Sequence, residues 1–245
     1  MLQNFFQPAT LAARILPAFL VVVIFAAAAR GLGAVSLSGA IAGGVIAFIL
    51  YVTAGPAAFL VLFCVFILSF VATRLGYDRK LSLGTAERRG GRRASQILAN
   101  LGIAAGLSGA SAVTSPQDML LLGSVSALAE AAADTVSSEF GQAVTEHAYL
   151  VTNLRPVKAG TDGGVSVAGT LAGLAAAIIV AMVAWDLRLI KGDWIMPAVA
   201  AAAIGAGIDS FLGATLERRA LIGNNSVNLI GTAVAAGAGI VLAML

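Results

Sequence analysis

The chain has 245 residues, of which 59% are hydrophobic and only 11% are charged, with a net charge of +3. About a quarter of the residues of an ordinary soluble domain are charged, so this composition excludes a soluble globular protein. It predicts a single integral membrane domain, 1–245, built from helices.

Eight apolar runs predict eight membrane-spanning helices, which together form an all-α, polytopic transmembrane helix bundle. In chain order they lie near 14–34, 36–54, 56–73, 95–114, 117–138, 165–185, 194–214 and 227–245. The second and third runs are separated only by Gly55-Pro56, a pair typical of turns. A signal peptide is the alternative interpretation of the first run, because small residues follow it at 27–29.

The basic residues are distributed unequally between the predicted loops. If both termini lie outside the cytoplasm, twelve of the 15 Lys and Arg residues fall on the inner side, and only Arg14, Arg188 and Lys191 fall outside. Seven of the twelve lie in a basic loop at about 74–94. The positive-inside rule therefore predicts this orientation, in a bacterial inner membrane, with the loops at about 139–164 and 215–226 on the cytoplasmic face.

Carboxylates near the ends of two apolar helices are the first candidate site residues. Glu130 and Asp134 are four residues apart and share one helix face. A carboxylate inside the bilayer costs about 2.5–3.5 kcal/mol, so it is expected to face a cavity, a partner or an ion. Carboxylate oxygens suit Mg²⁺. We predict that Mg²⁺ binds Asp134, Asp209, Glu130 and Glu139, and that the first two are catalytic. Helix capping and hydrogen bonding between helices are the alternative.

Two glycine-containing stretches, 160–166 and 223–228, precede or open apolar helices. Glycine lets backbone N–H groups converge, and a helix N-terminus attracts anions. A phosphate site is therefore expected, although plain turns would also account for these stretches, and there is no P-loop motif. The expected phosphate-binding residues are Gly160, Thr161, Asp162, Gly163, Gly164, Asn224, Asn225, Asn228 and Lys158.

A polar face leads from the basic loop into the fourth helix. Arg93, Gln96 and Asn100 are three and four residues apart, so they are predicted to share a face and contact an anionic substrate, with Arg93 catalytic. The basic loop could instead only set topology and bind lipid headgroups. Further substrate contacts are expected from the hydroxyl groups near the two acids, namely Thr135, Ser138 and Ser210.

A parallel internal repeat is a further prediction. The first unit contains Asp134-Thr135, then a glycine turn, then Gly169-Thr170. The second unit contains Asp209-Ser210, then a glycine turn, then Gly231-Thr232. Both units leave and re-enter the membrane in the same direction. Coincidence among glycine-rich helices is the alternative.

Together, these motifs resemble the integral-membrane family that includes transmembrane protein 19 and the plant phytyl-phosphate kinase of the vitamin E pathway. The resemblance covers roughly 36–245, and one departure is Leu101, where the family has glycine. It rests on QILAN at 96–100, ADTVSSEFG at 133–141, GTDGGVS at 160–166, DSFLGA at 209–214 and NNSVN at 224–228.

The resemblance implies transfer of a phosphoryl group from a nucleoside triphosphate to an isoprenyl monophosphate such as phytyl or geranylgeranyl phosphate, with Mg²⁺ as the cofactor. The donor is CTP or ATP, and CTP is favoured. Membrane lipids are the expected surroundings, nucleic acid is not an expected partner, and a homo-oligomer is compatible with the family. Three other interpretations stay open: a transporter or lipid flippase, a lipid-linked cytidylyltransferase, and a non-catalytic scaffold.

Overall fold

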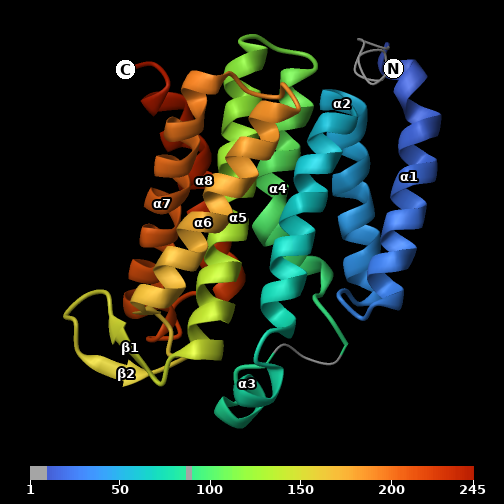
Figure 1. The fold of residues 1–245 in the computed structure, drawn as a ribbon. Helices are drawn as coiled ribbons and strands as arrows, with labels where there is room; N and C mark the ends of the chain where they lie inside the picture. Colours follow the sequence, from blue (N-terminus) through green and yellow to red (C-terminus); the bar gives the residue numbers. More distant parts are fainter. Residues whose placement is uncertain (1–9, 87–89) are drawn as a thin grey trace.

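The computed structural model describes residues 10–86 and 90–245, and it is a bundle of long helices that run past one another in alternating directions (Figure 1). Within these described residues, six helices or helical segments are long and apolar enough to cross a membrane. The predicted polytopic helix bundle is therefore confirmed. The helices are α1 (Leu11–Gly31), α2 (Leu37–Arg74), α3 (Tyr77–Leu83), α4 (Ala94–Ser111), α5 (Gln117–Val144), α6 (Val167–Asp186), α7 (Ile195–Leu212) and α8 (Asn224–Leu242).

Helix α2 is a hairpin of two spans that meet without a loop. Its backbone breaks at Gly55, where φ is 82° and ψ is −177°, a conformation that glycine adopts readily. The two halves then run side by side in opposite directions (Figure 1). They correspond to the predicted second and third helices. The break leaves carbonyl groups exposed, and Arg14 of α1 donates through Nη1 to those of Val52 and Thr53, at 3.2 and 3.3 Å.

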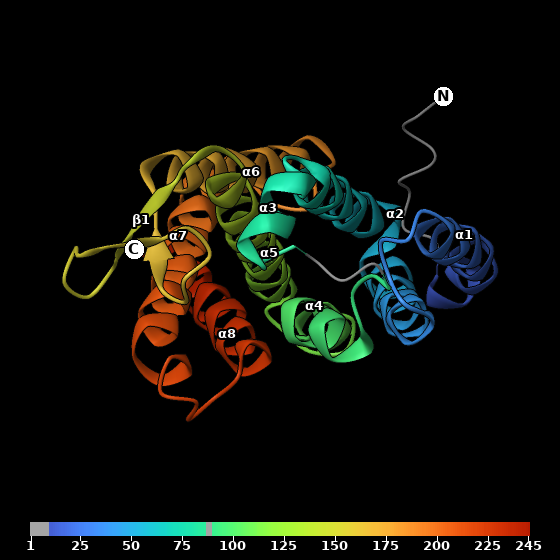
Figure 2. The same cartoon turned by 90° about the horizontal axis from the view of Figure 1, so that it is seen from below.

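Helix α5 is the centre of the bundle and packs against α2, α4, α6, α7 and α8 (Figure 2). Small residues make the closest of these approaches possible. A Cβ atom built on Gly173 of α6 would lie 2.7 Å from the carbonyl oxygen of Ala133, and one on Gly169 would lie 2.6 Å from that of Ser137. Helix α6 therefore lies against the backbone of the part of α5 that carries Asp134.

A small antiparallel sheet and α3 cover one end of the bundle, which we call the polar end (Figure 1). The strands are β1 (His147–Leu150), β2 (Pro156–Lys158) and β3 (Gly164–Val165), in the order β2-β1-β3. The predicted loop at about 139–164 therefore begins later than expected, because α5 continues to Val144, and strand pairing organises the rest of it. Likewise, the basic loop contains α3, whereas its residues Glu87, Arg88 and Arg89 lie outside the described residues.

The start of α1 and the end of α8 lie at the other end of the bundle (Figure 1). The sheet, α3, the start of α4 and the turn after α7 share the polar end, as the predicted topology requires. That this end faces the cytoplasm stays a prediction. The α5–α6 and α7–α8 hairpins run in the same direction, which agrees with a parallel repeat, although duplication itself also stays a prediction.

Candidate active site

A polar cavity of about 420 Å³ opens at the polar end, between α4, α5, α7, α8 and the sheet. Residues from separate stretches of the sequence meet there, carried by four helices and one turn. The predicted site residues that line it are Gln96, Asn100, Asp134, Thr135, Ser138, Glu139, Gly160, Thr161, Asp162, Gly163, Gly164, Asp209, Ser210, Asn224 and Asn228.

Arg92, and not the predicted Arg93, lines this cavity. Arg93 is the N-cap of α4 and has extended backbone angles, φ −87° and ψ 166°, so its exposed side chain does not continue the helical face of Gln96. Arg92 is held by backbone hydrogen bonds to the segment between α1 and α2: its N–H donates to the carbonyl of Ala34 at 3.1 Å, and its carbonyl accepts from Ser36 at 3.0 Å. Sequence spacing alone gave no reason to separate the two arginines.

Two other predicted residues, Lys158 and Asn225, are exposed and do not line the cavity. Lys158 ends the short strand β2, and Asn225 lies in the first turn of α8, next to Asn224, which does line it. One acid that the sequence analysis missed, Glu217, lines the cavity from a single π-helical turn that follows α7.

Glu130 lies one turn deeper in α5, at the place where α7 and α8 cross, and is only 1% exposed. A Cβ atom built on Gly205 of α7 would lie 2.7 Å from its Cγ, and one on Gly231 of α8 would lie 2.7 Å from its Oε1. The atom built on Gly231 would also lie 3.4 Å from the Cβ of Asp209. Two glycines therefore make the space for this carboxylate and set it beside Asp209.

Several acidic side chains surround Asp134. This carboxylate interacts electrostatically with those of Glu130, Asp209 and Glu217. The positively charged side chain of Arg92 also interacts electrostatically with the Asp134 carboxylate. Carboxylates that interact in this way are costly in a low-dielectric environment unless cations or protons compensate them.

Four buried oxygen atoms in this region accept no hydrogen bond from any described residue: Glu130 Oε1, Gln142 Oε1, Asp209 Oδ2 and Asn228 Oδ1. Unpartnered buried polar atoms are rare in folded proteins, and oxygen atoms of this kind are the ligands that Mg²⁺ prefers. Within residues 10–86 and 90–245, no three His, Cys, Asp or Glu side chains are grouped closely enough to hold a metal by themselves. The four predicted acids are therefore not brought together as one metal site. Because Mg²⁺ usually takes one or two protein carboxylates plus water and phosphate oxygens, its binding by Asp134 and Asp209 stays a prediction.

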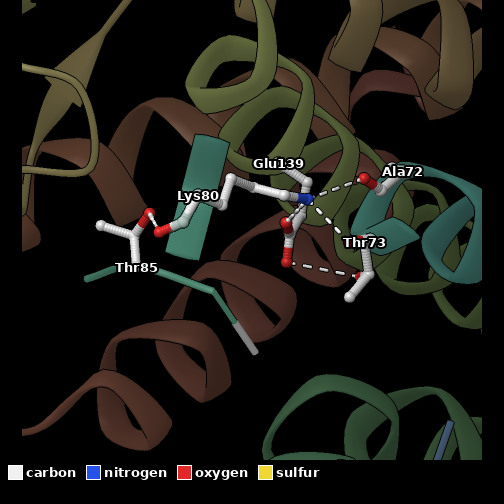
Figure 3. Close-up of polar contacts among 5 residues, drawn as sticks. All are labelled: Ala72, Thr73, Lys80, Thr85 and Glu139. Carbon is white, nitrogen blue, oxygen red and sulfur yellow. Dashed lines mark hydrogen bonds and ion pairs between the residues drawn. The ribbon is translucent and has the colours of Figure 1, made fainter. Parts of the chain in front are cut away.

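Glu139 is ion-paired with Lys80 of α3, at 2.5 Å, and the lysine side chain is fully buried (Figure 3). Lys80 also donates to the last carbonyls of α2, at 3.1 Å for Ala72 and 2.7 Å for Thr73. Helix C-termini leave such carbonyls unpaired. Lys80 thus fastens α3 to α2 and α5, and a metal-binding role for Glu139 stays a prediction.

Two amide side chains from motifs that lie far apart in the sequence meet inside the bundle. Asn228 of α8 donates through Nδ2 to Oδ1 of Asn100 on α4, at 3.1 Å, and Asn100 in turn donates to the carbonyl of Gln96, at 2.8 Å. This contact joins the QILAN and NNSVN stretches across the floor of the cavity. Their amide groups are therefore held in one arrangement.

The glycine turn at 160–164 and the N-terminus of α8 border the same cavity. Gly160 and Gly163 have φ of +85° and +71°, and a Cβ atom on Gly163 would collide with Ala214 after α7. Among the described residues, no side chain caps the first turn of α8. The N–H of Ser226 donates to the carbonyl of Gly223 at 2.8 Å, so the N–H groups of Asn224 and Asn225 are the ones left for an anion. A phosphate group placed here would face the carboxylate group across the cavity.

Comparison with known proteins places the chain among membrane proteins. Residues 20–236 match the family described as integral membrane protein DUF92. The "Uncharacterized membrane protein sll0875" of Synechocystis is 33% identical over 192 residues, covering 77% of this chain and 74% of its own length. Two Arabidopsis thaliana proteins also match: "Protein VTE6, chloroplastic", 31% identical over 184 residues (72% of this chain, 55% of its own), and "Protein PGR", 35% identical over 207 (74% and 71%). No solved structure matches the chain.

Proposed function

Because the chain belongs to the integral membrane protein family DUF92, we propose that it is a membrane prenyl-phosphate kinase that transfers a phosphoryl group from a nucleoside triphosphate, CTP in preference to ATP, to an isoprenyl monophosphate. One observation carries the proposal: unpaired carboxylate and amide oxygens lie across one polar cavity from a glycine turn and an uncapped helix N-terminus. The kinship with VTE6 and the resemblance to the phytyl-phosphate kinase family support it.

The cavity supplies what phosphoryl transfer requires, which is mostly positioning and neutralisation of negative charge. Asp134 and Asp209, with Glu130 behind them, would hold Mg²⁺, which neutralises phosphate charge when it is bound. The turn at 160–164 and the start of α8 would hold the phosphates of the donor. Arg92 and Asn100 would hold the phosphate of the acceptor.

The acceptor oxygen attacks the γ-phosphorus of the donor, the bond to the β–γ bridging oxygen breaks, and the nucleoside diphosphate leaves. The attacking oxygen belongs to a phosphate monoester that is already an anion at neutral pH, so the step needs no general base. This agrees with a cavity in which the described lining residues include carboxylates, amides and hydroxyls but not His147.

The test uses the purified protein in nanodiscs, with γ-labelled CTP or ATP and phytyl or geranylgeranyl phosphate. Label is expected in the lipid diphosphate, and chelation of Mg²⁺ is expected to abolish the transfer. Asp134→Asn and Asp209→Asn should each lower kcat by about 100-fold or more. Asp118→Asn is the control, because Asp118 is exposed and pairs with Lys191 at 3.2 Å. It lies in the first turn of α5, which begins at the other end of the bundle (Figure 1).

Intact phosphorylation in both site variants would refute the assignment of the site. Release of pyrophosphate in place of a nucleoside diphosphate would instead identify a cytidylyltransferase. Lipid flux across the membrane without nucleotide, in the absence of any transfer, would identify a transporter or flippase.

A further inference from the structure

A second cavity, also of about 420 Å³, lies between α1, the two halves of α2, α4 and α5. Its walls are mostly apolar, in contrast to those of the polar cavity. On α2, small residues such as Gly43 and Gly44 form one wall and large ones such as Leu62 and Phe66 form another. Its volume falls within the roughly 300–1,000 Å³ that is typical of small-molecule sites.

The two cavities meet at Arg92 and Asn100, which line both of them. Arg74 lies at the same end of the apolar cavity, where its guanidinium group stands over the ring of Phe70, 5.0 Å from the centroid, and donates to the carbonyl of Leu32 at 2.7 Å. The apolar cavity is therefore cationic and polar at the end that adjoins the polar cavity, and hydrocarbon-like elsewhere.

Aromatic rings continue from that charged end into the membrane interior. Phe70 stacks on Phe66 with centroids 5.8 Å apart, and Phe66 meets Phe25 of α1 edge to face at 5.1 Å. On α2 the lining runs from Thr73 back to Leu62, which is roughly 16 Å along a helix axis. That is about half of the ~30 Å hydrocarbon thickness of a bilayer.

We propose that the apolar cavity holds the hydrocarbon tail of the lipid monophosphate acceptor, whose phosphate lies at Arg92 and Asn100, where the two cavities meet. This inference rests on the proposed function and adds where the tail lies and which residues select it. The occupant is an amphiphile with one anionic end, because the cavity has one cationic end that opens onto the acids and phosphate-binding elements. The residues that determine tail specificity are then on α1 and α2, away from the phosphoryl-transfer site.

Gly43 gives a way to fill the cavity without disturbing the polar site. A Cβ atom built there would lie 3.9 Å from Cγ2 of Ile97, an ordinary contact, so a larger side chain can extend into the free space. Gly106 of α4 is the matched control, since it is exposed, lines neither cavity and has nothing within 4 Å of a built Cβ. The two variants to compare are Gly43→Leu and Gly106→Leu.

The first readout is binding, which does not depend on turnover. A geranylgeranyl monophosphate with a diazirine at the far end of its tail is photolysed with the protein in nanodiscs, and the labelled peptides are mapped. Labelling is expected on α1 near Phe25 and on α2 between Leu62 and Phe66. It should be lost in Gly43→Leu and retained in Gly106→Leu. Unlabelled geranylgeranyl phosphate should compete, whereas a two-chain phospholipid should not.

The second readout is kinetic. Gly43→Leu should raise KM for geranylgeranyl phosphate by about tenfold or more, and leave KM for isopentenyl phosphate nearly unchanged, because only the long tail meets the new side chain. Labelling elsewhere, equal competition by phospholipid, or equal loss for both acceptors would overturn the inference. Tail labelling in the apolar cavity without any phosphoryl transfer would refute the kinase and leave the lipid site standing.

Discussion

The buried ion pair between Lys80 and Glu139 allows a sharp test of how the polar end is held together. Lys80 is fully buried, and Glu139 is 13% exposed. In the variant Lys80→Met, the carboxylate loses its cation and two helix-end carbonyls of α2 lose their donor. Breaking a buried pair costs about 3–5 kcal/mol, and the partial exposure of Glu139 to the polar cavity favours the lower end of that range. We therefore expect a loss of about 3 kcal/mol in the free energy of unfolding.

The double variant Lys80→Met/Glu139→Gln should recover much of this loss, because no unpaired charge then remains. Unfolding of the purified protein in mixed micelles, followed by circular dichroism, gives the coupling energy of the double-mutant cycle. Lys158→Met and Glu146→Gln are the controls, since both residues are exposed at the same end of the bundle. A coupling energy below about 0.5 kcal/mol, the usual level for independent sites, would contradict the reasoning.

Two further predictions follow from neighbouring residues with different surroundings. Arg92→Gln should raise KM for the lipid monophosphate by about tenfold or more, because Arg92 lines both cavities. Arg93→Gln should change this KM little, because Arg93 lines neither cavity. Equal effects of the two variants in the kinase assay would restore the sequence-based choice of Arg93. Gly231→Ala should destabilise the protein by about 1–3 kcal/mol in the same unfolding experiment, because its methyl group would meet Glu130. Gly237→Ala is the control and should not destabilise the protein, because nothing lies within 4 Å of a Cβ atom built there. A neutral Gly231→Ala would show that Glu130 is not held at the α7–α8 crossing.

Much of the fold could be predicted from the sequence because apolar runs long enough to span a bilayer are a strong signal. Even the two halves of α2 were separable, since Gly55-Pro56 marks the break. The strands and α3 were not predicted. These are short polar elements, and α3 depends on the buried Lys80, which looks in the sequence like one more basic loop residue.

The candidate site was predictable as a set of motifs but not as a geometry. Helical spacing assigned Arg93 to the face of Gln96, and the extended N-cap conformation breaks that rule one residue before the helix. Glu217 had no distinctive sequence context. The apolar cavity depends on the packing of α1 against the α2 hairpin, which no local pattern encodes.

The contacts of Arg14 and Lys191 change how the charge asymmetry of the chain is interpreted. Arg14 lies in the first turn of α1, and Lys191 lies between the end of α6 and the start of α7. These segments are at the end of the bundle opposite the polar end (Figure 1), where positive residues count against the predicted orientation. Arg14 caps the carbonyls of the break in α2, where the helix dipole is negative. Lys191 pairs with Asp118 and stands over the ring of Trp194, 4.5 Å from the centroid. Each cation is thus retained for a structural reason and is matched by negative potential beside it, so its presence at that end does not argue against the predicted orientation.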